Sequence, residues 1–256
     1  MAAETYQTVR KAALILDVIG ACHSDGMRAA EIEREVHLGT STTVRLLSSL
    51  ENLGLVRKVE DQQYVIGDKV FLLSSQGLNH NPIFRESRML CQQLAQETGF
   101  NANVAQWDGE EAFYLCHFEG KLSPKSRAMV GMSLPMHASG IGKCLMMDMS
   151  EQQRRDLLGD ELHPYTSHTV TDHQQLTERI SEAHRRGYAI ENQELAYGRM
   201  CVAAPIRDSS SQICAALSLS GRLSIMTREG IDELAEQTVE IADRISVNLG
   251  MLGGAV

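Results

Sequence analysis

The sequence lacks paired cysteines, long apolar runs and a surplus of positive charge, and each absence excludes a class of protein. Its six cysteines form no C-x-x-C pair, and no histidine follows any of them at zinc-finger spacing. No apolar run approaches the roughly 20 residues of a membrane-spanning helix. The first residues, MAAETYQTVRKAA, lack the apolar segment of a secretory signal. We therefore expect a reduced cytoplasmic protein with no membrane segment, no metal site and no cofactor.

The charge balance excludes a strong general attraction to nucleic acid. The formal net charge is −9, and residues 1–75 carry eight basic side chains against ten acidic ones. Any binding of DNA by this segment must therefore rest on a few locally placed cations, and on two copies acting together. The length of 256 residues predicts one or two domains.

Residues 27–59, MRAAEIEREVHLGTSTTVRLLSSLENLGLVRKV, are typical of a helix-turn-helix. The spacing of apolar residues predicts a short helix over 29–35 and a longer one over 40–52. A turn over 36–39 separates them, and Gly54 has the position of a residue that ends a helix.

The longer helix begins with a polar turn opposite its apolar face. Val44, Leu47 and Leu50 recur at helical spacing and are expected to face the core. The opposite face opens with small or charged side chains, namely Thr40, Ser41, Thr42, Thr43 and Arg45. Hydroxyls and an arginine on such a helix can reach base edges and phosphates in the major groove.

Two short strands are predicted after this helix, over residues 55–59 and 64–66. They form a wing whose first strand carries Arg57 and Lys58. Without the wing, a helical hairpin of an enzyme explains the pattern equally well; with it, a winged helix-turn-helix that binds DNA is favoured. The residues expected to contact DNA are Arg10, Arg28, Thr40, Ser41, Thr42, Thr43, Arg45, Arg57 and Lys58.

The rest of the chain predicts a second domain of mixed strands and helices. The segment GLNHNP at 77–82 is rich in turn formers and marks a boundary. The helix predicted over 83–98 is a connector, a core helix of the second domain, or both. Strand pairs, helices, further strand pairs and a closing helix then indicate an α+β domain with an antiparallel sheet. The expected divisions are a first domain at 1–76, a linker helix at 77–98 and a second domain at 99–256.

Five segments together resemble the IclR (isocitrate-lyase regulator) family of bacterial transcription factors. They are VRKAALIL, STTVRLLSSLENLGLV, LPMHASGIGK, GYAIENQELAYGRMCVAAPI and ALSLSG, and they follow one another in the family's order. The resemblance covers nearly the whole chain. It implies a winged helix-turn-helix domain, a linker helix and a GAF/PAS-like effector-binding domain. It also implies homodimers, often paired into homotetramers, bound to palindromic double-stranded operators beside catabolic genes.

The resemblance further implies a ligand site in the second domain. Carried over by motif, its residues are Gly140, Ile141, Glu191, Cys201, Ser218 and Ser220. Ser218 and Ser220 are two residues apart, so both point to the same face of a strand. Two hydroxyls beside the start of a helix can bind a small carboxylate. We expect a small organic acid, or a sugar-derived acid, as effector, because the expected lining is polar and few aromatic residues are available for stacking.

The chain departs from the family pattern at two positions. Glu191 stands where aspartate is usual, so its carboxylate reaches one methylene further. Arg199 stands where relatives commonly have an apolar residue. If Arg199 faces inward, it can hold an acidic ligand by two hydrogen bonds; if it faces outward, which is slightly favoured, it is a surface charge.

Two other classes of function use the cysteines. A cysteine-dependent hydrolase would take Cys201 as nucleophile with His137 as its base, but no group is recognisable that orients the pair. A redox-sensing module would use Cys144 or Cys201.

Overall fold

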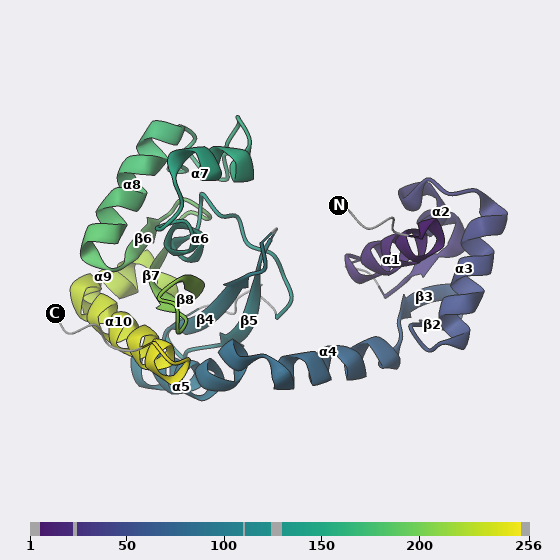
Figure 1. The fold of residues 1–256 in the computed structure, drawn as a ribbon, viewed down its shortest axis with the longest axis horizontal. Helices are drawn as coiled ribbons and strands as arrows, with labels where there is room; N and C mark the ends of the chain where they lie inside the picture. The colour runs from purple at the N-terminus through teal and green to yellow at the C-terminus, as the bar shows by residue number, and fades with distance from the viewer. Residues whose placement is uncertain (1–5, 23–24, 110, 124–129, 252–256) are drawn as a thin grey trace. The chain divides into compact units, whose positions relative to one another are not determined.

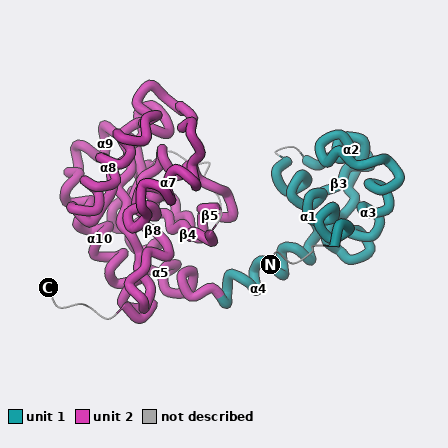
Figure 2. The backbone as a smooth tube through the Cα atoms, turned by 45° about the horizontal axis from the view of Figure 1, so that its top comes forward, with its two compact units in different colours: residues 1–80 teal, residues 81–256 magenta. Residues whose placement is uncertain are grey.

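The computed structural model describes residues 6–22, 25–109, 111–123 and 130–251. The chain divides into two compact units, residues 1–80 and 81–256, which have different colours in Figure 2. No helix in the described residues is long and apolar enough to cross a membrane.

The first unit is a winged helix-turn-helix followed by a further helix (Figure 1). Its elements are α1 (Gln7–Gly20), β1 (Met27–Arg28), α2 (Ala29–Val36), α3 (Thr40–Asn52), β2 (Val56–Lys58), the 3-10 turn η1 (Glu60–Gln62), β3 (Gln63–Ile66) and α4 (Asp68–His80). The wing strand β3 pairs antiparallel with both β2 and β1, and the short strand β1 was not predicted. Ile15, Ile32 and Leu47 are completely buried at the centre of the three helices.

The turn expected over 77–82 is wrong for its first four residues, because α4 continues to His80. A single glycine costs a helix only about 1 kcal/mol, so Gly77 does not stop it. The helix ends where Asn81 caps the next one, α5 (Pro82–Thr98), with Pro82 at its first position. Here the Asn81 side chain accepts a hydrogen bond from the backbone N–H of Phe84 at 3.0 Å.

The second unit is built on a five-stranded antiparallel sheet in the order β5-β4-β8-β7-β6. The strands are β4 (Asn101–Trp107), β5 (Ala112–Phe118), β6 (Ala189–Asn192), β7 (Arg199–Arg207) and β8 (Ile213–Arg222). The predicted α+β architecture with an antiparallel sheet is therefore confirmed. The helices are α5, α6 (Gly140–Leu145), α7 (Glu151–Leu158), α8 (His173–Arg186), α9 (Leu223–Glu229) and α10 (Ile231–Asn248).

Helices cover both faces of this sheet. Helices α5 and α10 pack against one face, and α6, with α8 beyond it, lies against the other (Figure 1). The close approach of α6 to the sheet depends on Gly140, because a Cβ there would lie 3.2 Å from side-chain atoms of Cys201 and Ala203 on β7. The closing helix was expected to be continuous, but Gly230, at φ 97°, separates α9 from α10.

Candidate functional sites

Helix α3 presents a polar face to solvent, as expected of a recognition helix. Ser41 and Arg45 are exposed one turn apart, and Thr42 is half-buried beside them. Because residues four apart lie on one side of a helix, Ser41 and Arg45 face the same way. These side chains have the placement that contact with base edges requires.

The predicted orientation of α3 is wrong at two neighbouring positions. Thr43 is 1% exposed, and its hydroxyl donates to the backbone oxygen of Gly39 at 3.3 Å, so it faces the core instead of DNA. Val44, which was expected inside, is 51% exposed. The buried stripe of the helix is Thr43, Leu46, Leu47 and Leu50. Val44 thus joins the candidate DNA-contacting face, where an apolar side chain can contact a thymine methyl group.

The remaining residues that were predicted to contact DNA are all exposed, but some of their side chains already contact a neighbouring residue. Arg10 on α1 and Arg57 on β2 are exposed. Lys58 lies over the ring of Tyr64, with 5.5 Å between its Nζ and the ring centroid. Thr40 donates its hydroxyl to the carboxylate of Glu33 at 2.7 Å, so part of its hydrogen-bonding capacity is already used.

Arg28 occupies the start of α2 and is held there through its backbone. Its backbone N–H donates to the carboxylate of Glu31 at 2.7 Å, while its side chain is exposed. The side chain therefore remains available to a phosphate, at a position that the backbone fixes.

In the second unit, the strand register places most of the predicted ligand residues on one face of the sheet. Ser220 pairs with Cys201, and Cys201 pairs with Glu191 on the next strand. Directly opposed residues of antiparallel strands point to the same face, so these three side chains form a row. Ser218 lies on the same face, two residues before Ser220.

A cavity of about 1130 Å³ opens beside this row. Of the predicted residues, only Arg199 and Ser220 line it. The favoured outward orientation of Arg199 is therefore wrong: the side chain faces the cavity and is 26% exposed. The cavity also has apolar walls, which the sequence did not predict, formed by Met132, Leu134, Pro135, Leu195, Ala196 and Leu223.

Glu191 and Arg199 form an ion pair at this cavity. Arg199 donates from Nη1 to Oε2 of Glu191, and the backbone N–H of Leu195 donates to Oε1 at 3.1 Å. Glu191 is completely buried. Burial raises the pKa of its carboxyl, and the guanidinium of Arg199 opposes that rise.

Gly140 and Ile141 lie in the packing between α6 and the sheet, away from the cavity surface. Both are buried, and a Cβ on Gly140 would lie 3.2 Å from the sulfur of Cys201. The backbone N–H of Gly142 donates to the side chain of Ser139 at 3.0 Å, so the capping residue already uses this amide of the helix start. Gly140 therefore allows α6 to approach the sheet closely, and Gly142 allows the start of α6 to pack against the backbone of Met136.

Three residues that the sequence analysis missed belong to the same face. Asn103 donates from Nδ2 towards the hydroxyls of Ser218 at 3.3 Å and Ser220 at 3.5 Å. Its Oδ1 is 2.7 Å from Nδ1 of His117, while Tyr114 lines the cavity. The signal was the alternation of Asn101 and Asn103 with the apolar Ala102 and Val104 in β4, which places both amides on one face.

The cysteine alternatives find no support in the geometry. Cys201 is 2% exposed and Cys144 is completely buried, and burial raises the pKa of both thiols, which keeps them protonated. The ring of His137 contacts the backbone oxygen of His163 at 2.9 Å. Within the described residues, no group of three or more His, Cys, Asp or Glu side chains is placed to hold a metal ion.

Both units match models of known domains. Residues 8–60 match the IclR helix-turn-helix domain, and residues 75–247 match the bacterial transcriptional regulator IclR C-terminal domain. The chain is 31% identical over 224 residues to the transcriptional repressor IclR of Escherichia coli, covering 86% of this chain and 82% of that protein. It is 28% identical over 246 residues to the regulator XynR of the same organism, covering 95% and 97%.

Solved structures agree with these matches. The Thermotoga maritima IclR structure has a TM-score of 0.76 at 29% identity, covering 95% of this chain and 98% of that one. An Alicyclobacillus acidocaldarius regulator has a TM-score of 0.86 at 22% identity, covering 96% and 100%. The curated relatives carry the names of transcriptional repressors and regulators and not of enzymes. Because the C-terminal domain model alone matches more than half of the chain, this protein belongs to the IclR family, as a DNA-binding transcriptional regulator with a C-terminal effector-binding domain.

Proposed function

We propose that α3 enters the major groove of a palindromic operator and that the wing contacts the adjacent backbone. The observation that carries this proposal is the exposed side of α3, where Ser41, Val44 and Arg45 lie together. Arg57 and Lys58 on β2 supply the cations for phosphates. Since the overall charge does not favour DNA, such locally placed groups must supply most of the affinity.

The proposed DNA-binding form is a homodimer, or a homotetramer of two such dimers. Phe71, Leu72 and Leu73 on α4 are at least half exposed, as is Val9 on α1. Large apolar side chains gathered on exposed helices are typical of surfaces that a partner covers. A twofold pair would place two recognition helices on the two half-sites of a palindrome. We place this activity in the bacterial cytoplasm, on operators that serve catabolic genes.

The proposed effector is a small organic acid bound in the cavity beside β7 and β8. Arg199 provides a cation for its carboxylate and Ser220 a hydroxyl. The sequence favoured a small or sugar-derived acid because a polar lining was expected. The apolar walls instead favour an acid that also has an apolar part, which Leu134 and Leu195 would contact.

A binding experiment with the protein's own upstream DNA tests both proposals. Fluorescence anisotropy at moderate ionic strength should give clear preference for that duplex over a random duplex of equal length. A thermal-shift screen of carboxylic acids then identifies candidate effectors, since a ligand of the folded state raises its melting temperature. An acid from this screen should change operator affinity, because its affinities for the two states of the regulator differ. Equal affinity for both duplexes would refute the DNA-binding proposal.

A further inference from the structure

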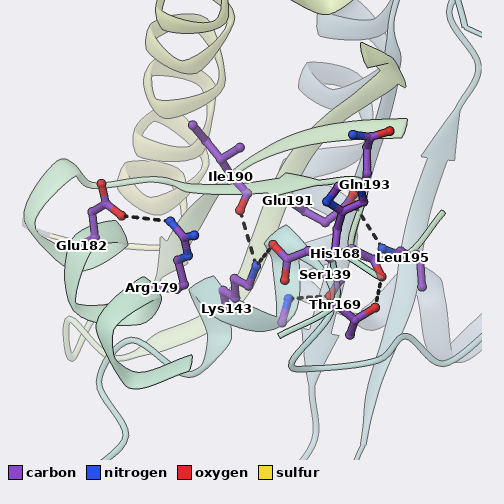
Figure 3. A network of polar contacts seen from close by, with 12 residues as sticks. Ser139, Lys143, His168, Thr169, Arg179, Glu182, Ile190, Glu191, Gln193 and Leu195 are labelled. Atoms are coloured by element: carbon purple, nitrogen blue, oxygen red, sulfur yellow. Dashed lines mark hydrogen bonds and ion pairs between the residues drawn. The ribbon is translucent and has the colours of Figure 1, made fainter. Parts of the chain in front are cut away.

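A second, more polar cavity of about 380 Å³ lies between α8 and β6, and it shares no lining residue with the larger one. Its lining residues are Lys143, His168, Val170, Arg179, Glu182, Ala183, Arg186, Ala189, Ile190, Asn192 and Glu194. Figure 3 shows Lys143 near the backbone oxygen of Ile190, and Arg179 facing Glu182 on α8. The cavity therefore has two charged parts. The buried part contains Lys143 and Glu194, and the exposed part contains Arg179, Glu182 and Arg186.

The buried part holds an ion pair with one carboxylate oxygen left over. Lys143 is 1% exposed and pairs with Oε1 of Glu194, which is 7% exposed. The other oxygen of Glu194, Oε2, is buried and has no hydrogen-bond partner among the residues that the structure describes. A buried carboxylate oxygen without a donor destabilises a protein, so an unpartnered one in a cavity wall indicates that a donor is supplied from the cavity.

Glu194 is held in this position by its own backbone. The hydroxyl of Thr169 donates to its carbonyl oxygen at 2.6 Å, and that of Thr166 lies 3.5 Å from the same oxygen. Both threonines are buried. The backbone of Glu194 is therefore fixed, and its carboxylate, paired with the buried Lys143, stays in the wall of the cavity.

The exposed part carries more positive than negative charge. Arg179 and Arg186 both approach Glu182, at 3.8 Å and 2.5 Å, and their side chains are 63% and 37% exposed. A guanidinium has five N–H donors, so one shared carboxylate leaves most of the ten donors available. Two guanidiniums with donors to spare are a suitable site for a carboxylate or a phosphate.

We propose that this cavity is a second binding site, for a small anion that also carries a hydroxyl group. The anionic group binds Arg179 and Arg186, and the hydroxyl donates to Oε2 of Glu194. Residues 195–199 line the larger cavity and follow Glu194 directly in the chain. A ligand on Glu194 therefore acts on the segment that carries Arg199, whichever effector the larger cavity binds.

Titration calorimetry of the full-length protein tests the site with two matched pairs of probes. One pair is glycerol 3-phosphate and propyl phosphate, and the other is glycerate and propionate. Within at least one pair, the hydroxylated probe should bind about tenfold more tightly than its partner. The partner has no hydroxyl and cannot donate a hydrogen bond to the carboxylate of Glu194. The pair that responds tells whether the site prefers phosphate or carboxylate. Absence of binding by all four probes overturns the proposal and leaves the Lys143–Glu194 pair as a structural brace.

Substitutions on α8 locate the binding without disturbing the buried pair. The double variant Arg179→Gln/Arg186→Gln should bind the hydroxylated probe at least tenfold more weakly than the natural protein does. Arg185→Gln is the matched control, because Arg185 is exposed on the same helix but does not line this cavity. Ser218→Ala/Ser220→Ala should also leave the probe's affinity unchanged, which separates this site from the proposed effector site. An equal loss in either control would overturn the proposal.

Discussion

The guanidinium of Arg199 donates to the completely buried carboxylate of Glu191, so the cation that faces the larger cavity already has an acid as its partner. An effector carboxylate must share this guanidinium with Glu191 or replace Glu191 on it. Removing one member of a buried pair leaves the other unpaired, so the two residues act as a unit. Glu191 therefore influences how strongly an acidic effector binds, although it does not line the cavity itself.

The affinity for an acidic effector should depend on pH with a definite sign. Burial raises the pKa of Glu191, so this group takes up a proton at a higher pH than an ordinary glutamate does. Protonation removes the charge that competes for Arg199. Affinity for a carboxylate that stays ionised should therefore rise as pH falls through the raised pKa, measured by calorimetry between about pH 5 and 8.

Glu191→Gln is the test of this assignment, because it keeps the size of the side chain and removes its titration. The variant should bind the acid with little dependence on pH, and near neutral pH it should bind more tightly than the natural protein. If the natural protein and the variant have the same pH profile, Glu191 does not compete for Arg199.

The two serines of β8 should couple the effector to DNA binding. Ser218→Ala/Ser220→Ala removes the hydroxyls that Asn103 approaches at 3.3 and 3.5 Å. Operator affinity without effector should stay within about twofold, while the effect of the acid on that affinity should be lost. Anisotropy titrations with and without the acid measure both quantities. A normal response in the double variant would place the effector elsewhere.

Arg45→Ala should weaken operator binding without lowering stability. If Arg45 contacts a guanine, the loss is about 1 to 3 kcal/mol and is confined to one base-pair position; a phosphate contact gives a uniform loss across sequences. Titrations against operators with single base changes distinguish the two.

Thr43→Val is the control for Arg45→Ala, because Thr43 is buried and, among the described residues, its hydroxyl donates only to the backbone oxygen of Gly39. This change should leave operator affinity nearly unaltered and lower the unfolding free energy by about 1 kcal/mol. A large loss of affinity in a folded Thr43→Val protein would contradict the orientation of α3.

Two glycines should respond to alanine in opposite directions. Gly142→Ala forces a Cβ into the backbone of Met136 and should lower the stability of the second unit by about 1 to 3 kcal/mol or more. Gly77→Ala meets no atom within 4 Å inside α4 and should stabilise that helix by about 0.5 to 1 kcal/mol. Chemical denaturation of each variant measures both effects, and a neutral Gly142→Ala would contradict the close packing of residue 142 against Met136.

Local signals were enough to predict most helices and strands. The recognition helix has its predicted bounds, Thr40–Asn52, and the sheet of the second unit is antiparallel as predicted. Periodicity and turn residues carry this information, because they act over a few residues. The side of α3 that faces the core was harder to predict from the sequence. Thr43 belongs to the buried stripe, at spacings of three and four, because its own helix satisfies the hydroxyl of the threonine.

Local patterns were sufficient to predict the order of elements, the polar helix of the DNA-binding unit and the two serines on one face of a strand, because each depends on neighbours in the chain. That Arg199 faces the cavity, and that Lys143 meets Glu194 from 51 residues away, became clear only from the folded unit. Such partners are set by strand register and by how closely α6 approaches the sheet. Register and helix approach follow from packing the whole unit at once, and no local pattern specifies them.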